Sequence, residues 1–134
     1  MSYSTINTWK SIMNTGNHKK LVNIIHDNAT FHSPVVFTPQ EGKKKVIKYL
    51  SSAVEIFKER NFHYTENIIT DNIRFYAEFK ANFNKIEVNG IDFIKCENNL
   101  IKEFKVFLRP VKGIEVVWKE MKSKLVQYDS NLSQ

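Results

Sequence analysis

Apolar residues recur every three or four positions near the start of the chain, a pattern that predicts amphipathic helices. Ile6, Trp9 and Met13 form the apolar stripe of a first helix, and Gly16 is placed to end it. This helix is expected to bury one face against the rest of the fold.

A second, shorter helix is predicted around Leu21, Ile24 and Ile25, whose spacing matches one buried stripe. The pair Asp27-Asn28 is expected to break this helix before an extended stretch at residues 29–33. The first strand would therefore begin after the break.

A third helix is predicted after a loop that Pro34 and Pro39 bracket, with Gly42 in the turn that leads into it. Its apolar residues repeat at three and four positions: Val46, Ile47, Leu50, Ala53, Val54 and Phe57. One face of this helix is therefore expected to pack on the core.

Between residues 61 and 110 the pattern changes to alternation of apolar and polar positions, which is typical of strands. One face of the segment 73–80 is apolar, at Ile73, Phe75, Ala77 and Phe79. Turn-forming pairs recur at Asp71-Asn72, Asn84-Lys85 and Asn98-Asn99. The spacing predicts an antiparallel meander with one buried face and one solvated face.

After Pro110 a last helix is predicted, and residues 128–134 are expected to form a flexible tail. The apolar stripe of this helix comprises Ile114, Val117, Trp118, Met121 and Leu125. The whole pattern predicts one α+β domain over residues 1–134, with its core between about residues 5 and 126. In this domain, three to four helices pack on a curved antiparallel sheet that encloses an apolar pocket.

Composition favours a pocketed fold over a compact helix bundle. Aromatic residues make up 13% of the 134 residues, and ten of them are Phe. Large flat side chains fill the wide interior of a curved sheet and can line an apolar cavity. A net charge of +6 would suit an anionic partner, but the lysines are spread along the chain and their only run, Lys43-Lys44-Lys45, falls at a helix start. No nucleic-acid binding is expected.

The single cysteine, Cys96, excludes an internal disulfide and a cysteine-rich metal site. The four histidines follow no metal-ligand spacing, and no phosphate-binding glycine loop is present. We therefore expect no metal and no cofactor. The first residues lack the features of a signal peptide, and no apolar run approaches membrane-spanning length, so a cytoplasmic location is expected.

Five short motifs occur in a characteristic order: Trp9 followed by residues 14–18, the segment 27–31, Ser33-Pro34 with Gly42, the segment 89–93, and the segment 107–110. In this order the chain resembles the nuclear transport factor 2-like superfamily, which includes SnoaL-like polyketide cyclases and ketosteroid isomerases. The resemblance runs from about residue 5 to 126. It implies a cone-shaped cavity, often in a dimer.

Asp92 is the first candidate for chemistry, because alternation places it on one strand face with Val88, Gly90 and Ile94. A lone acid among apolar neighbours is expected to have a raised pKa, so it can donate a hydrogen bond or act as a base. By resemblance Asp92 stands where ketosteroid isomerases keep the protonated acid of their oxyanion hole. The alternative is a structural Asp satisfied by a neighbouring Tyr, Trp or backbone donor.

Three mechanisms of the superfamily each lack a part here. Ser33 stands where ketosteroid isomerases carry their general-base Asp, and a serine hydroxyl does not abstract a proton unaided. Gly90 stands where the epoxide-hydrolase relatives need an Arg. SnoaL-like cyclases use an acidic base in the cavity, and the expected inward face of the last strand offers only apolar residues, namely Phe104, Val106 and Leu108.

Other candidates have weaker arguments. By resemblance Trp9 stands where ketosteroid isomerases have an oxyanion-hole Tyr, and its indole N–H can still donate, but a core-filling role is favoured. His32 could act as a base, but alternation points it outward beside Ser33. Either His63 or Tyr64 faces the pocket, and Tyr64 is the preferred choice. Arg109 could hold a ligand carboxylate or a sheet-edge ion pair.

The predicted site therefore combines Asp92 and His32 as possible catalytic groups with a ligand wall of Trp9, Ser33, Tyr64, Phe75, Val88, Phe104 and Arg109. The leading hypothesis is a domain that binds a small apolar or amphipathic molecule with one polar group directed at Asp92. The alternative is a cofactor-independent isomerase, cyclase or dehydratase-type enzyme that uses Asp92 as acid or base. A weaker alternative is a protein-interaction module.

The outer face of the sheet is expected to carry an aromatic patch among charged residues, formed by Tyr76, Ile91, Phe93 and Phe107. Exposed apolar patches usually mark interfaces. A homodimer through this face is therefore predicted.

Overall fold

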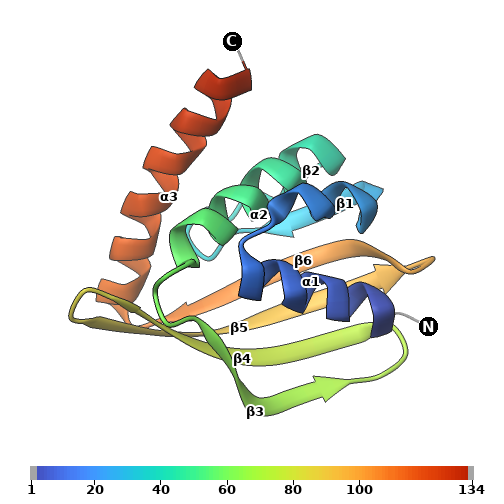
Figure 1. The fold of residues 1–134 in the computed structure, drawn as a ribbon, viewed down its shortest axis with the longest axis horizontal. Helices are drawn as coiled ribbons and strands as arrows, with labels where there is room; N and C mark the ends of the chain where they lie inside the picture. The colour runs from blue at the N-terminus through green and yellow to red at the C-terminus, as the bar shows by residue number, and fades with distance from the viewer. Residues whose placement is uncertain (1–2, 133–134) are drawn as a thin grey trace.

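The computed structural model describes residues 3–132 and is built on one six-stranded sheet (Figure 1). The helices are α1 (Tyr3–Thr15), the 3-10 helix η1 (His18–Asn23), α2 (Lys43–Phe57) and α3 (Val111–Leu132). The strands are β1 (Ile25–His32), β2 (Gln40–Glu41), β3 (His63–Thr70), β4 (Arg74–Phe83), β5 (Ile86–Glu97) and β6 (Leu100–Arg109).

The sheet has the strand order β2-β1-β6-β5-β4-β3 and is antiparallel except where β1 runs parallel to β6. The predicted meander is confirmed as β3 to β6. Asn84, Asn98 and Asn99 adopt positive φ angles in its tight turns, a conformation that Asn tolerates better than most residues.

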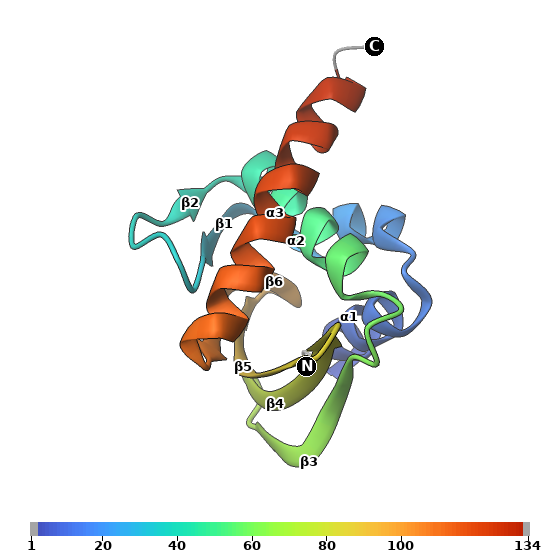
Figure 2. The same ribbon diagram turned by 90° about the vertical axis from the view of Figure 1, so that its left-hand side faces the viewer.

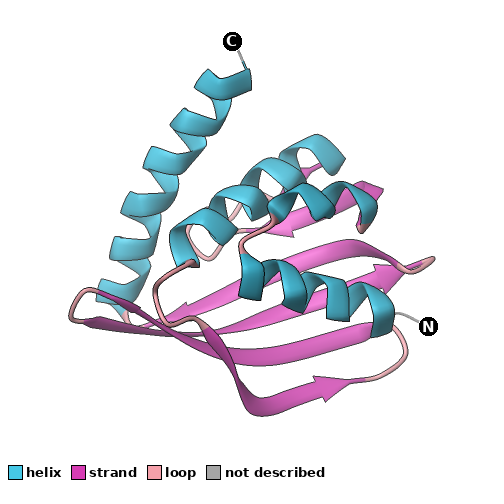
Figure 3. Ribbon diagram, viewed as in Figure 1, coloured by secondary structure: helices cyan, strands magenta, loops and turns pink. Residues whose placement is uncertain are grey.

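The sheet curves strongly, and α1, α2 and α3 lie on its concave side (Figures 2 and 3). The predicted α+β class with a curved, open, mainly antiparallel sheet is therefore confirmed. The first helix ends as expected, because Gly16 has a φ of 77° and its N–H bonds back to Ile12 at 2.8 Å. The third predicted helix corresponds to α2.

The short helix predicted around Leu21 forms as the 3-10 helix η1, but its predicted extension through Ile24 and Ile25 was wrong. β1 already begins at Ile25, so Asp27 and Asn28 lie inside the strand instead of before it. Ile25 is fully buried and pairs with Ile101 of β6, and the register shifts between Ile25 and Thr30. This tertiary pairing outweighs the local helical spacing, because a strand that bulges can still bury consecutive apolar residues.

The last helix is longer than its apolar stripe suggested. α3 continues through Leu132, into the segment expected to be a tail, and residues 133–134 lie outside the described part of the chain. Lys48 of α2 contacts Asp129 at 2.9 Å, which ties the far end of α3 to α2. Within residues 3–132, no helix combines the length and hydropathy that crossing a membrane requires.

The concave face of the sheet is apolar, and its residues alternate as predicted along β4, where Phe75, Ala77 and Phe79 are buried. Ile73 departs from this pattern: it precedes β4 and is 40% exposed, because it belongs to the turn. The interior contains two clusters of buried apolar residues. The half-buried residues that pack against both clusters are Met13, Tyr49, Tyr64 and Val106. The candidate site lies at this junction.

Candidate functional site

Asp92 lies in the middle of β5 with its side chain toward the concave side of the sheet. Its register partners are Ala77 on β4 and Val106 on β6, and it is only 4% exposed. Burying a carboxyl group among apolar neighbours is costly unless hydrogen bonds replace its hydration. Alternation along β5 therefore turns this acid toward the buried face of the sheet.

Two side chains form a hydrogen-bonded chain that ends on this carboxyl group. The Tyr64 hydroxyl donates to Oδ2 of Asp92 at 2.5 Å, and Nε1–H of Trp9 donates to the Tyr64 hydroxyl at 2.8 Å. Trp9 comes from α1, Tyr64 from β3 and Asp92 from β5. The indole therefore supports the tyrosine, and among the described residues the tyrosine is the hydrogen-bond partner of the acid.

The structure answers which residue of the pair 63–64 faces the interior. Tyr64 points inward, while His63 is exposed, with Nδ1 2.9 Å from the carbonyl oxygen of Asn61. The register of β3 on β4 shifts between Tyr64 and Ile68. A register shift of this kind changes which side chains face inward, so simple alternation could not settle the choice.

Burial raises the pKa of Asp92 to about 7, although the hydrogen bond from Tyr64 favours the carboxylate and opposes the rise. Burial also raises the pKa of Tyr64 well above its usual value, and the neighbouring charge of Asp92 adds to this rise. Tyr64 therefore keeps its proton, and Asp92 is the group that titrates near neutral pH.

The carboxyl group of Asp92 keeps hydrogen-bonding capacity. Among the described residues only Tyr64 bonds to it, and that bond uses Oδ2. A carboxylate accepts up to about four hydrogen bonds, and a protonated carboxyl group donates one. Oδ1 is therefore the atom through which Asp92 can meet a further polar group.

Two small cavities lie close together on the concave side of the sheet, and Asp92 lines the inner one. The inner cavity, of about 30 Å³, is lined by Trp9, Met13, Phe31, Leu50, Ala53, Phe57, Phe62, Phe79, Asp92, Phe104 and Val106. The outer pocket, of about 40 Å³, is lined by Phe31, Ser33, Pro34, Val35, Tyr49, Ala53, Phe57, Val106, Leu108, Val117, Trp118 and Met121. Both are apolar apart from a few side chains, and four residues line both: Phe31, Ala53, Phe57 and Val106.

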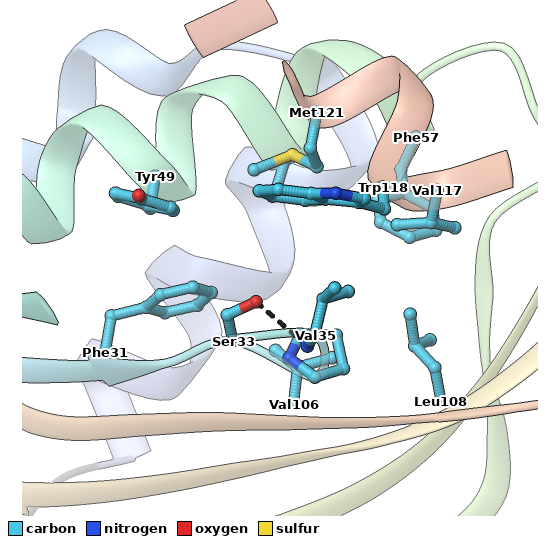
Figure 4. A pocket seen from close by; sticks show the side chains of 12 residues that line it. Phe31, Ser33, Val35, Tyr49, Phe57, Val106, Leu108, Val117, Trp118 and Met121 are labelled. Carbon is cyan, nitrogen blue, oxygen red and sulfur yellow. Dashed lines mark hydrogen bonds between the residues drawn. The ribbon is translucent and has the colours of Figure 1, made fainter. Parts of the chain in front are cut away.

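The outer pocket lies between the helices and the last strand (Figure 4). Trp118 and Met121 of α3 lie on one side of it, and Val106 and Leu108 of β6 lie on the other. Ser33 lines its edge. The Ser33 Oγ accepts hydrogen bonds from the backbone N–H groups of Val35 and Val36, at 3.1 and 3.4 Å. This serine therefore shapes the loop after β1.

The predicted ligand wall is only partly brought together. Trp9, Phe104 and Asp92 line the inner cavity, and Ser33 lines the outer pocket. The ring of Trp9 packs edge-on against Phe104, with centroids 4.9 Å apart. Tyr64 reaches the site through its hydrogen bonds.

Four predicted residues lie elsewhere. Phe75 and Val88 are buried in the core without lining either cavity. Arg109 is exposed at the end of β6 and donates to Oδ1 of Asn89 at 3.4 Å. His32 faces away from Asp92 and lies 3.1 Å from Glu103, because alternation along β1 turns Phe31 inward instead. His32 therefore cannot serve the Asp92 site in this structure.

Sequence reasoning missed the part of the wall that the helices supply. Tyr49 and Phe57 of α2 and Trp118 and Met121 of α3 line the outer pocket. Phe57, Trp118 and Met121 belong to the predicted apolar stripes, but periodicity does not separate packing from pocket lining. Tyr49 lies outside the predicted stripe of its helix. Within residues 3–132, no group of three or more His, Cys, Asp or Glu side chains is placed to hold a metal ion.

The comparisons with known proteins agree with this architecture. The profile of the SnoaL-like domain matches residues 7–104. The chain is similar to the structure of a steroid delta-isomerase from Pseudomonas aeruginosa, with 26% identity and a TM-score of 0.88, over 96% of this chain and 94% of that one. Among curated proteins none gives a significant match.

Two further structures show the same fold. A protein with a cystatin-like fold from Silicibacter pomeroyi has 21% identity and a TM-score of 0.86, over 99% of this chain and 92% of that one. A nuclear transport factor 2-like protein of unknown function from Mesorhizobium loti has 12% identity and a TM-score of 0.72, over 81% of this chain and 91% of that one. The family match covers well over half of the chain, and the fold agrees with it, so the chain belongs to the SnoaL-like domain family.

Proposed function

We propose that this protein binds a small, mostly apolar molecule whose single polar group meets Oδ1 of Asp92. The observation that supports the proposal is a buried carboxyl group at the wall of an apolar cavity, with Tyr64 as its one hydrogen-bond partner among the described residues. Ligand sites usually combine apolar walls with a few convergent polar groups. Here the Trp9–Tyr64–Asp92 chain supplies the polar group.

The ligand's apolar body would occupy the outer pocket and the inner cavity together. Drug-sized ligands need roughly 300 Å³ or more, whereas the two cavities measure about 30 and 40 Å³. The ligand is therefore small, or side chains move to join the cavities. Phe31 and Phe57 line both, so rotation of their rings would connect the outer pocket to Asp92.

Native mass spectrometry of the purified protein, with and without the Asp92→Ala substitution, tests the proposal. We expect a co-purified small molecule to appear with the wild type and to be lost from the variant. Asp27→Ala is the matched control, because the Asp27 side chain is 90% exposed. A molecule retained equally by all three proteins, or an apolar probe that fails to bind any of them, would argue against a ligand at Asp92.

A second candidate function is an isomerase or lyase that uses Asp92 as its acid or base. Two observations favour it: the pKa of Asp92 is about 7, which suits proton transfer near neutral pH, and the 26%-identical structure is a steroid delta-isomerase. Ser33 stands at the position that holds the general base in ketosteroid isomerases, but its Oγ accepts hydrogen bonds from the loop backbone. The reaction would therefore rely on one titrating carboxyl group.

Enzymatic function predicts turnover of a ketone or similar substrate with a pH profile centred near the pKa of Asp92. Asp92→Asn keeps the shape of the side chain but cannot exchange a proton at neutral pH. The ligand identified by mass spectrometry is then tested with the wild type and with Asp92→Asn. If both proteins bind it and neither converts it to a product, the binding proposal stands and the enzymatic function is excluded for that ligand.

We also propose that two copies of the chain associate through the convex face of the sheet. Tyr76, Ile91 and Phe107 are exposed there, and the ring of Tyr76 packs on Phe93 with centroids 4.9 Å apart. Ile91 and Phe107 are register partners on neighbouring strands, so the patch is continuous. Light scattering at micromolar concentration should give a dimer for the wild type and a monomer for Phe107→Glu. A monomeric wild type would count against the proposal.

A further inference from the structure

A second, polar pocket of about 220 Å³ lies between α2, α3 and η1. It is lined by His18, Ser51, Ser52, Glu55, Lys124, Gln127, Tyr128 and Asn131. Helical spacing places Ser51, Ser52 and Glu55 on the opposite face of α2 from the residues that line the apolar cavities. One helix therefore separates an apolar site from a polar one.

Ser52 is the feature of this pocket that packing does not explain. The residue is only 3% exposed, and its Oγ has no hydrogen-bond partner among the described residues. An unpaired buried hydroxyl group destabilises a protein, whereas an alanine at a helix contact would not. A polar group that enters the pocket would give this hydroxyl a partner.

The charges around the pocket leave a cation available. Glu55 is already paired, with Lys58 at 2.8 Å and His18 at 3.2 Å. Lys124 donates to the neutral amide oxygen of Gln127 at 3.2 Å. Lys58 lowers the pKa of Glu55 most, and the charge of Lys124 adds to this effect. The strong partners of that carboxylate are nevertheless Lys58 and His18. The groups of this pocket that can still form hydrogen bonds are therefore mostly donors, and they lie beside a positive charge.

Donors beside an ammonium group favour an acceptor-rich, negatively charged ligand. We propose that this pocket binds a small oxyanion, a carboxylate or a phosphate, with Lys124 as the charged contact and the hydroxyl groups of Ser52 and Tyr128 as further donors. Such a ligand would bridge α2 and α3. The site is independent of the one at Asp92, because the two pockets share no lining residue.

Backbone ¹H–¹⁵N resonances of the full chain test the proposal during titration with sodium phosphate, and separately with sodium succinate, at constant ionic strength. We expect saturable shifts at Ser52, Lys124 and Tyr128 with one of the two anions, which also identifies the anion class. Sodium chloride should give no saturable shift. A charge-assisted hydrogen bond contributes enough that Lys124→Gln should weaken binding about tenfold or more.

Lys119→Gln is the matched control, because it removes the same charge from an exposed position on α3 outside the pocket. It should bind the anion as the wild type does. Ser52→Ala should weaken binding while leaving the fold intact. The proposal is overturned if neither anion gives saturable shifts, if Lys124→Gln binds as tightly as wild type, or if Lys119→Gln weakens binding as much as Lys124→Gln.

Discussion

The hydroxyl group of Tyr64 on β3 donates to the carboxyl group of Asp92 on β5 at 2.5 Å, although β4 lies between these two strands in the sheet. Register explains how the contact spans a strand. Tyr64 pairs with Phe79, and Phe79 pairs with Gly90, two residues before Asp92 on the same face of β5. Because Gly90 has no side chain, the Phe79 ring fits over it, and Asp92 remains within reach of the tyrosine.

Removing the tyrosine hydroxyl group should raise the pKa of Asp92 further, because the hydrogen bond from Tyr64 is what favours the carboxylate. For Tyr64→Phe we expect the titration midpoint of Asp92 to move upward by about one pH unit, given the usual strength of a hydrogen bond to a charged group. Carboxyl ¹³C NMR measures this directly. Tyr76→Phe on the convex face is the control and should leave the midpoint unchanged.

The raised pKa of Asp92 makes stability depend on pH. A carboxyl group whose folded pKa lies above its unfolded value binds more protons in the folded state, so stability falls as pH rises between the two values. For Asp92 this window runs from its usual pKa of 3.8 to about 7, and the loss across it is about 4 kcal/mol.

Asp92→Asn should remove most of that dependence. We expect the variant to be more stable than wild type at pH 8 and to lose this advantage near pH 4, as measured by urea unfolding across the range. Wild-type stability that stays level from pH 4 to pH 8 would contradict the burial of an ionisable Asp92. Asp27→Asn controls for the exposed acids.

Gly90 should tolerate no side chain. A Cβ at this position would lie 2.4 Å from Cζ of Phe79 and 2.5 Å from the backbone oxygen of Phe107. Gly90→Ala is therefore expected to destabilise the fold by about 1–3 kcal/mol or more, measured by urea unfolding.

Gly113→Ala is the matched comparison, because the residue is helical and its added Cβ would lie 3.2 Å from Cδ of Pro110 and 3.3 Å from Cγ2 of Val88, much farther than at Gly90. Helix propensity favours Ala by about 1 kcal/mol, and the tight contacts of the added Cβ oppose this gain. The net change in the free energy of unfolding should therefore be close to zero. Equal destabilisation by the two substitutions would mean that crowding over β5 is not the cause.

Under the proposed function, phenol should bind more tightly than benzene, because only phenol carries a polar group for Asp92. We expect a difference of about tenfold in NMR titrations of the wild type, and none with Asp92→Ala. Ala53→Val should weaken both ligands, because Ala53 lines both cavities and two added methyl groups would occupy their junction. Tight binding of both ligands to Ala53→Val would place the site elsewhere.

Much of the fold could be predicted from local pattern. The spacing of Val46, Leu50 and Val54 predicts α2, and the alternation of Phe75, Ala77 and Phe79 predicts the buried face of β4. These patterns are reliable because each element buries one face on a single core. The burial of Asp92 followed from the same alternation.

The sequence by itself therefore determined the class of the fold, the buried faces of regular elements such as α2 and β4, and the acid placed among apolar residues. Only the tertiary structure decided which partners that acid has. Tyr64 faces inward because β3 shifts its register against β4, and β1 begins at Ile25 because Ile25 pairs with Ile101. Ser52 and Lys124 line the same pocket only because α3 packs on α2. Contacts between distant segments depend on register and packing, and neither is encoded in the periodicity of a single element.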